Sequence, residues 1–136
     1  MIRYMLDTNT CIAIIKRRPD SIQTRLADLP VDEVAISSIV AAELSYGVAL
    51  SQKKKQNETA LKDFLDYVVV LDWPFDACRI YGRIREDLKK KGTPIGAMDI
   101  LIAAHALLLD AVLVTDNERE FARIADLKME NWTKDK

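Results

Sequence analysis

The fold is decided by the stretch Ile2-Arg3-Tyr4-Met5-Leu6-Asp7-Thr8-Asn9, in which an apolar run ends on a carboxylate and polar residues follow. A short apolar run bounded by polar residues is typical of a buried strand. In a parallel sheet, ligands bind beyond the carboxyl ends of the strands, where the loops into the following helices converge. Asp7 is therefore predicted to lie at the edge of the sheet where a functional site forms.

Apolar runs and helical patterns alternate along the rest of the chain, and this order favours an α/β protein. We expect a three-layer α/β/α domain whose central, mostly parallel sheet has about four or five strands. The predicted strands cover residues 2–6, 34–36, 67–71, 111–114 and 128–130. The predicted helices cover 10–16, 21–28, 39–50, 58–66, 76–91, 97–109 and 117–124, with Ser38 as the cap of the third and 51–57 as a surface connection. Residues 1–132 are expected to form this single domain, followed by a polar tail at 133–136.

The composition is that of an ordinary globular protein, with 136 residues, 49% hydrophobic residues, a net charge of −1 and a pI of about 5.8. This charge gives no sign that the surface as a whole binds nucleic acid. No run reaches the roughly 20 apolar residues that span a membrane, and no secretory leader is visible, so we expect a cytoplasmic protein. Cys11 and Cys78 lack metal-ligand spacing and are expected to be small buried residues in a reducing compartment.

Four carboxylates occupy related places in this pattern. Asp7 and Asp116 closely follow apolar strands, whereas Glu43 and Asp99 fall early in predicted helices. Each alone has a structural explanation, because carboxylates cap helices and are favoured near helix N-termini. Gathered at one edge of a sheet, however, they would repel one another strongly unless a cation lay between them. The set predicts a site for a hard cation, Mg²⁺ or Mn²⁺, which can activate water for attack on a phosphodiester.

Asp99 is the carboxylate that is hardest to explain by local structure. It lies in the apolar run Ile95–Ala104, where a charge costs several kcal/mol if it is desolvated and unpaired. No lysine or arginine lies within a helical turn of it. A metal ion shared with Asp7 would remove this cost for both residues, so the sequence predicts a metal-dependent nuclease.

Four segments, taken together and in this order, resemble the PIN-domain ribonucleases and, more narrowly, the VapC toxins of bacterial toxin–antitoxin pairs. The resemblance runs from Met1 as far as Trp132 and so covers nearly the whole chain. The segments that carry it are Met5–Asn9, Ser37–Leu44, Lys91–Asp99 and Val114–Phe121.

The resemblance implies that Asp7, Glu43 and Asp99 are the three central acids of the pocket and its metal ligands. The fourth position varies in the family; here Asp116 is the expected fourth acid and ligand, and Glu120 is the next candidate for a catalytic acid. Hydrogen bonds that orient these carboxylates are expected from their neighbours Thr8, Asn9, Thr115 and Asn117.

The resemblance also implies an endoribonuclease that cuts structured RNA, most commonly tRNA, and thereby inhibits translation. Similarity to the enteric members makes the anticodon stem–loop of initiator tRNA a candidate target. A homodimer and a VapB-type antitoxin are implied as well, the two proteins forming a hetero-oligomer. The apolar residues that could receive the antitoxin, if they do not simply pack the core, are Ile12, Ile15, Ile22 and Leu26.

Two basic runs are candidates for contacts with RNA phosphates, although such runs are as often merely solvated faces. The residues concerned are Lys53, Lys54, Lys55, Arg83, Arg85, Lys89, Lys90 and Lys91. His105 is the only histidine and, at about 100° per residue, lies well off the helix face of Asp99, so we expect it to be structural.

A second class of protein, the response-regulator receiver, stays open as the alternative. Receivers are non-catalytic phospho-acceptor modules that also hold Mg²⁺ at the strand ends of a small parallel domain, and Asp72 after Val68–Leu71 would be the phosphorylated residue. Against this, a receiver has adjacent acids after its first strand, where this chain has Asp7-Thr8-Asn9. A receiver also has a lysine after its last core strand, which Ala111–Asp116 lacks, so we interpret Asp72 as a turn residue.

Overall fold

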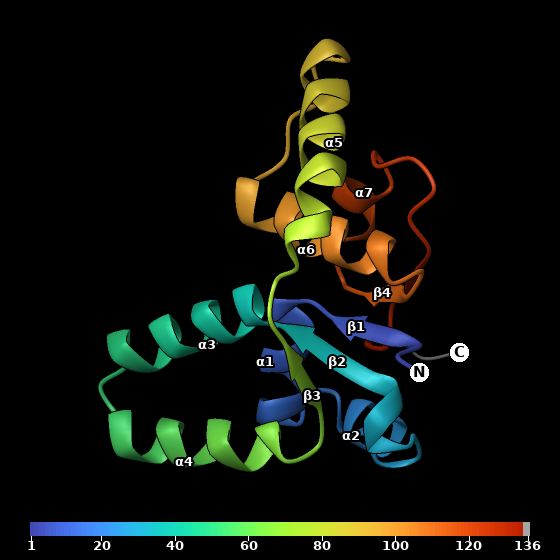
Figure 1. Ribbon diagram of the computed structural model, residues 1–136. Helices are drawn as coiled ribbons and strands as arrows, with labels where there is room; N and C mark the ends of the chain where they lie inside the picture. Colours follow the sequence, from blue (N-terminus) through green and yellow to red (C-terminus); the bar gives the residue numbers. More distant parts are fainter. Residues whose placement is uncertain (135–136) are drawn as a thin grey trace.

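The computed structural model describes residues 1–134 and contains a five-stranded sheet at its centre (Figure 1). The strand order is β3-β2-β1-β4-β5, and every neighbouring pair is parallel. The α/β architecture expected from the alternating pattern is thus confirmed, with a sheet that is parallel throughout. The last two residues of the expected polar tail lie outside the described residues. The strands are β1 (Tyr4–Leu6), β2 (Val34–Ser37), β3 (Val69–Leu71), β4 (Val112–Val114) and β5 (Met129–Glu130).

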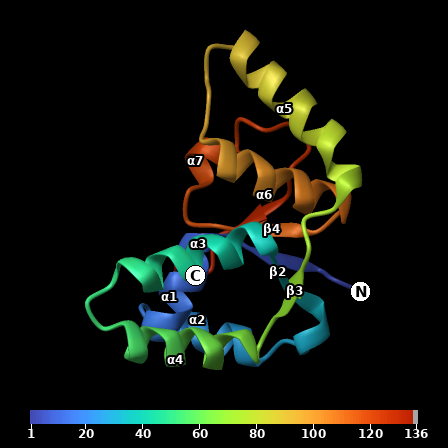
Figure 2. The ribbon, with the colours of Figure 1, turned by 60° about the vertical axis from the view of Figure 1, so that its left-hand side comes forward.

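Helices cover both faces of this sheet. In Figures 1 and 2, α1 and α2 lie on one side of the strands and α5 and α6 on the other, while α3 and α4 form a hairpin that projects from the body. Short 3-10 turns at Val31–Glu33 and Phe75–Ala77 precede β2 and α5. The helices are α1 (Thr8–Lys16), α2 (Asp20–Ala27), α3 (Ser38–Leu50), α4 (Lys54–Leu65), α5 (Cys78–Lys90), α6 (Ala97–Leu108) and α7 (Glu118–Phe121).

The strand register brings several chain segments to one edge of the sheet. Leu6 pairs with Val114 and Ser37 pairs with Leu71, each at the carboxyl end of its strand. The residues that follow these strands therefore emerge side by side, which is the arrangement that parallel α/β proteins use for ligand sites.

Six of the seven helices described in residues 1–134 begin one to four residues away from the predicted position, and α3 and α4 are the two that bear on the predicted cap and connection. The strand β2 runs through Ser37, whose hydroxyl accepts a hydrogen bond from the backbone N–H of Ile39 at 3.2 Å and so caps α3 in place of Ser38. Helix α4 begins at Lys54, so part of the stretch expected to be a connection is helical, although Lys54 and Lys55 remain exposed. Polar residues of good helix propensity can extend a helix whose apolar face is packed further along the chain.

The core occupies both faces of the central strands, because a parallel sheet is covered on both sides. Met5, Ile36 and Leu113, from three adjacent strands, are fully buried. Within residues 1–134, no helix is long and apolar enough to cross a membrane.

The two cysteines have different environments. Cys11 is fully buried, as expected, whereas Cys78 is exposed and the expectation for it is wrong. The buried positions around the start of α5 include Ala77 and Ile84, and Cys78 is rotated by about 100° from that stripe.

The sheet order rules out the receiver alternative. Receivers have the strand order 2-1-3-4-5, in which the third strand is central. Here β3 is an edge strand, and Asp72 is an exposed residue directly after it. Asp72 lies in the irregular connection between β3 and the 3-10 turn at Phe75–Ala77.

Candidate active site

Asp7 stands where β1 passes into α1. Its backbone N–H donates to the carbonyl of Val114 at 3.0 Å, which continues the pairing with β4. Its side-chain Oδ1 accepts a hydrogen bond from the backbone N–H of Thr10 at 2.9 Å and so caps α1. The residue as a whole is only 4% exposed. The side chain of Asp7 therefore both caps α1 and places a buried carboxylate at the edge of the sheet.

The protonation of Asp7 reflects this burial. Desolvation raises the pKa of Asp7 above its ordinary value, whereas hydrogen bonds from Thr115 and Thr10 lower it and the charge of Asp116 raises it again. Thr115 was expected to orient a carboxylate, and the structure places it beside Asp7. Thr10 was not singled out from the sequence, although an Asp followed three residues later by a backbone donor is the ordinary signal of a helix cap.

Glu43 reaches the same edge from α3. The hydroxyl of Thr8, in the first turn of α1, donates a hydrogen bond to Oε1 of Glu43. This contact brings the acid of α3 next to the residue that follows Asp7. Thr8 therefore contacts one of the predicted acids, and its orienting role stays a prediction.

Asp99 reaches the edge from the first turn of α6. Burial raises the pKa of Asp99 to about 6, and the charges of Glu43, Asp7 and Glu120 act in the same direction. Four carboxylates, one at the N-cap of α1 and the others on α3, α6 and α7, therefore share one electrostatic environment. Among residues 1–134, none of these four carboxylates forms an ion pair with a basic side chain.

Both candidates for the fourth acid lie at this edge. Asp116 is exposed beyond β4 and is close enough to raise the pKa of Asp7. Glu120, in α7, accepts a hydrogen bond from Nδ2 of Asn117 at 2.9 Å, while the backbone N–H of Asn117 donates to the hydroxyl of Thr115 at 2.9 Å. Asn117 therefore orients Glu120 rather than capping α7 with its side chain.

Asn9 and His105 make no hydrogen bond to the acids among residues 1–134. Asn9 is exposed, and among residues 1–134 its side chain makes no hydrogen bond to a carboxylate. His105 is buried in α6, as expected of a structural residue, and burial lowers its pKa.

The basic runs have two different surroundings. Lys53, Lys54 and Lys55 are exposed at the start of α4, at the tip of the projecting hairpin. Arg83 and Lys89 are exposed on α5, whereas other basic groups on α5 and at Lys91 just after it have partners about one helical turn away, as they do on a solvated face. These pairs join Lys90 to Glu86 at 3.5 Å, Lys91 to Asp87 at 3.0 Å and Arg85 to the hydroxyl of Tyr81 at 2.6 Å.

The donor atoms at this edge are carboxylate and hydroxyl oxygens, which are the ligands of hard divalent cations. Within residues 1–134, no three histidine, cysteine, aspartate or glutamate side chains form a ready-made metal cage. A Mg²⁺ ion does not require one, because it is usually held by one or two carboxylates and keeps several waters. The geometry therefore fits an open, partly hydrated site, which is the kind that can act on a phosphodiester.

Comparison with known proteins agrees with this geometry. Residues 4–127 match the family model of the PIN domain. The chain is 47% identical to ribonuclease VapC2 of Rickettsia felis, over 96% of this chain and 98% of that protein. It is 42% identical to the tRNA(fMet)-specific endonuclease VapC of Salmonella typhimurium, over 97% of this chain and 99% of that protein.

A solved structure gives the same result in three dimensions. The crystal structure of VapBC2 from Rickettsia felis, bound to a DNA fragment from its promoter, contains a chain that superposes with a TM-score of 0.90 at 46% identity, covering 97% of this chain and 99% of that one. Sheet order, acid placement and full-length similarity lead to one conclusion. This chain belongs to the PIN-domain family and, within it, to the VapC ribonucleases, the phosphodiester-hydrolysing toxins of toxin–antitoxin pairs.

Proposed function

We propose that this VapC ribonuclease is a Mg²⁺- or Mn²⁺-dependent endonuclease whose substrate is tRNA. The observation that carries the proposal is the gathering of Asp7, Glu43 and Asp99 at one sheet edge with no cationic side chain paired to them among residues 1–134. The name of the Salmonella typhimurium relative, a tRNA(fMet)-specific endonuclease, supports initiator tRNA, cut in its anticodon stem–loop, as the first substrate to test.

Nucleases of this family are typically metal-dependent, and the residues present suit such an ion. Asp7 and Asp99 would be the main ligands, with Glu43 and Asp116 completing the oxygen set and Glu120 beside them as a further acid. A divalent cation here would relieve the repulsion that raises the pKa of Asp99.

The chain's own contribution is to hold the acids ready. When bound, a divalent ion polarises the scissile phosphate and makes a nearby water more acidic. Thr10 and Thr115 hold the carboxylate of Asp7, and Thr8 holds that of Glu43, so the acids need little reorganisation during the reaction. Because water is the nucleophile, no serine, cysteine or histidine nucleophile is required, and the buried His105 plays no part in the reaction.

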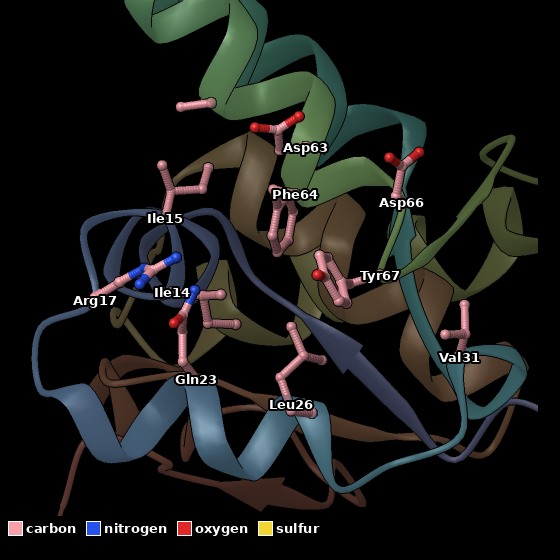
Figure 3. Close-up of a pocket in the computed structure, with 12 residues that line it drawn as sticks. Ile14, Ile15, Arg17, Gln23, Leu26, Val31, Asp63, Phe64, Asp66 and Tyr67 are labelled. Atoms are coloured by element: carbon pink, nitrogen blue, oxygen red, sulfur yellow. The ribbon is translucent and has the colours of Figure 1, made fainter.

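This chain has a groove that could receive the proposed VapB-type antitoxin, and none of the proposed catalytic acids lines it. A cavity of about 560 Å³ opens between α1, α2 and α4, and Figure 3 shows Phe64 and Tyr67 pointing into it toward Leu26. Ile15 and Leu26, two of the four residues expected to receive the antitoxin, line this groove, whereas Ile22 is fully buried in the core. The lining comprises Ile14, Ile15, Arg17, Gln23, Leu26, Ala27, Val31, Ala60, Asp63, Phe64, Asp66 and Tyr67.

An apolar groove rimmed by Asp63 and Asp66 suits a peptide that carries apolar side chains and a basic residue. The relatives of known structure include VapBC complexes from Rickettsia felis and Salmonella typhimurium, which supports an antitoxin partner. Tyr67→Ala, at a rim residue that is 55% exposed, should weaken antitoxin binding about tenfold by calorimetry, as expected for loss of an aromatic contact. Unchanged affinity would place the antitoxin elsewhere.

A homodimer in the cytoplasm completes the proposal. Tyr46 and Leu50 of α3 are exposed apolar side chains one helical turn apart, and Phe75 is also exposed. Such side chains are typical of a protein–protein interface. The mass of the purified chain by light scattering, alone and with antitoxin, tests the dimer and the hetero-oligomer.

The decisive experiment is cleavage of total tRNA by the purified, antitoxin-free chain in Mg²⁺, run beside EDTA and the single variants Asp7→Asn and Asp99→Asn. Discrete fragments that disappear with EDTA and in both variants are the expected result. Asp32→Asn, at an exposed aspartate on the amino side of β2, is the matched control and should cleave normally. Equal cleavage by the wild type with and without EDTA would refute metal dependence.

A further inference from the structure

Trp73 joins two helices that carry acids of the candidate site. It lies in the connection between β3 and α5, which Figures 1 and 2 show passing beside the start of α3 and near α6. Its backbone N–H donates to the hydroxyl of Ser38 at 3.0 Å, and its indole N–H donates to the carbonyl of Leu101 at 2.8 Å. One residue thus uses both of its N–H groups to bridge α3 and α6.

The two anchor points are close in sequence to two of the acids. Ser38 is the first residue of α3, which carries Glu43, and Leu101 lies half a turn beyond Asp99 in α6. The helices α3 and α6 also contact each other directly. The charges of Glu43 and Asp99 oppose this contact, because the charge of Glu43 disfavours ionisation of Asp99.

We propose that Trp73 is a positioning residue for the acid pair. By tying α3 to α6, it fixes the separation of Glu43 and Asp99 against their mutual repulsion, so that both carboxylates reach one divalent cation. The inference rests on the proposed metal-dependent nuclease function and extends it to a residue outside the acidic motifs. Trp73 touches neither acid and acts only through the two helices.

The chain contains a matched control for this role. Its only other tryptophan, Trp132, also donates its indole N–H to an oxygen, Oε1 of Glu130, at 3.1 Å. Trp132 is more deeply buried and packs edge-to-face on Tyr4, with ring centroids 5.3 Å apart. It lies after β5 and bridges no acid-bearing helices, so the same substitution at the two positions separates positioning from general stability.

The experiment compares Trp73→Phe with Trp132→Phe in the full-length, antitoxin-free protein. For Trp73→Phe we expect about a tenfold weaker affinity for Mn²⁺ by calorimetry and about a tenfold lower kcat for tRNA cleavage, with KM for tRNA little changed, as is typical when a partner of a metal ligand is lost. Trp132→Phe should keep the Mn²⁺ affinity and the kcat of the wild type, even if its melting temperature falls more than that of Trp73→Phe. Equal Mn²⁺ affinity in the two variants would overturn the inference.

A second pair of variants tests the other end of the bridge. Ser38→Ala removes the acceptor for the backbone N–H of Trp73 and should weaken Mn²⁺ affinity, whereas Ser38→Thr keeps a hydroxyl and should restore it. If both Ser38 variants lose Mn²⁺ affinity, or if neither does, the result would argue against the bridge. A wild type that neither binds Mn²⁺ nor cleaves tRNA would refute the proposed function itself, whereas a competent wild type with an unaffected Trp73→Phe refutes only the role of Trp73.

Discussion

The hydroxyl of Thr8 donates a hydrogen bond to Oε1 of Glu43, and this contact joins α1 to α3 across the carboxyl edge of the sheet. Thr8 directly follows Asp7 in the chain. The positions of Asp7 and Glu43 are therefore coupled by one residue and one hydrogen bond. Removing that bond tests whether the carboxylates must be held in place for cleavage.

Thr8→Val keeps the shape of the side chain but cannot donate to Glu43. We expect its single-turnover rate of tRNA cleavage to fall about 10- to 100-fold, the usual cost of losing a residue that orients a metal ligand. Thr8→Ser retains a hydroxyl and should stay within a few fold of the wild type. A Thr8→Val rate equal to that of the wild type would show that Glu43 needs no orienting partner.

Asp99→Asn should raise stability while abolishing cleavage. Because the pKa of Asp99 in the folded protein is about 6, above the ordinary value of 3.8, ionising it opposes folding. This penalty is absent below pH 3.8, grows as the pH rises toward 6 and is complete above that. The full pKa shift would lower the free energy of unfolding by about 3 kcal/mol, and solvent screening of the partly exposed carboxylate reduces this penalty to about 1 kcal/mol.

Urea unfolding in EDTA measures this effect. At pH 7.5 the variant should be more stable than the wild type, and at pH 4 the difference should nearly vanish. The control Asp32→Asn, at an exposed position, should track the wild type at both pH values. A variant that is less stable at pH 7.5 would mean that the charge of Asp99 has a stabilising partner.

Metal affinity should depend on pH around the pKa of Asp99. A carboxylate must lose its proton to bind a cation, so protons and metal compete. The Mn²⁺ concentration for half-maximal cleavage should rise about tenfold per pH unit below pH 6 and level off above it. Titrations of Mn²⁺ at several pH values measure this dependence. A half-saturating concentration that does not change between pH 5 and 7 would exclude Asp99 as a ligand.

The cysteines should differ in reactivity. Burial raises the pKa of the Cys11 thiol well above its usual range, whereas Cys78 is exposed at the start of α5. Because the thiolate is the reactive form, a chromogenic disulfide reagent should modify Cys78 rapidly and Cys11 only after unfolding in urea. Cys78→Ser should remove the rapid phase and leave the slow one. A fast phase in that variant would mean that Cys11 is accessible.

Much of the fold follows from local patterns in the sequence. The strands are short and mostly apolar, and Asp7 directly follows the first of them, so its place at the sheet edge is predictable from its neighbours alone. The gathering of Asp7 with Glu43 and Asp99 could be anticipated because parallel strands direct their loops to one edge. The boundaries of α3 and α4 and the exposure of Cys78 could not, since they depend on how the helix faces pack.

The sequence by itself thus determined the order of strands and helices and the acids near their ends, because these depend on contacts within a few residues. Only the tertiary structure decided which side chains hold those acids. Thr8 meets Glu43 across 35 positions, and Trp73 meets Ser38 and Leu101 across 35 and 28 positions. Such hydrogen bonds exist only once α1, α3 and α6 have packed at particular distances, and no local pattern of residues specifies those distances.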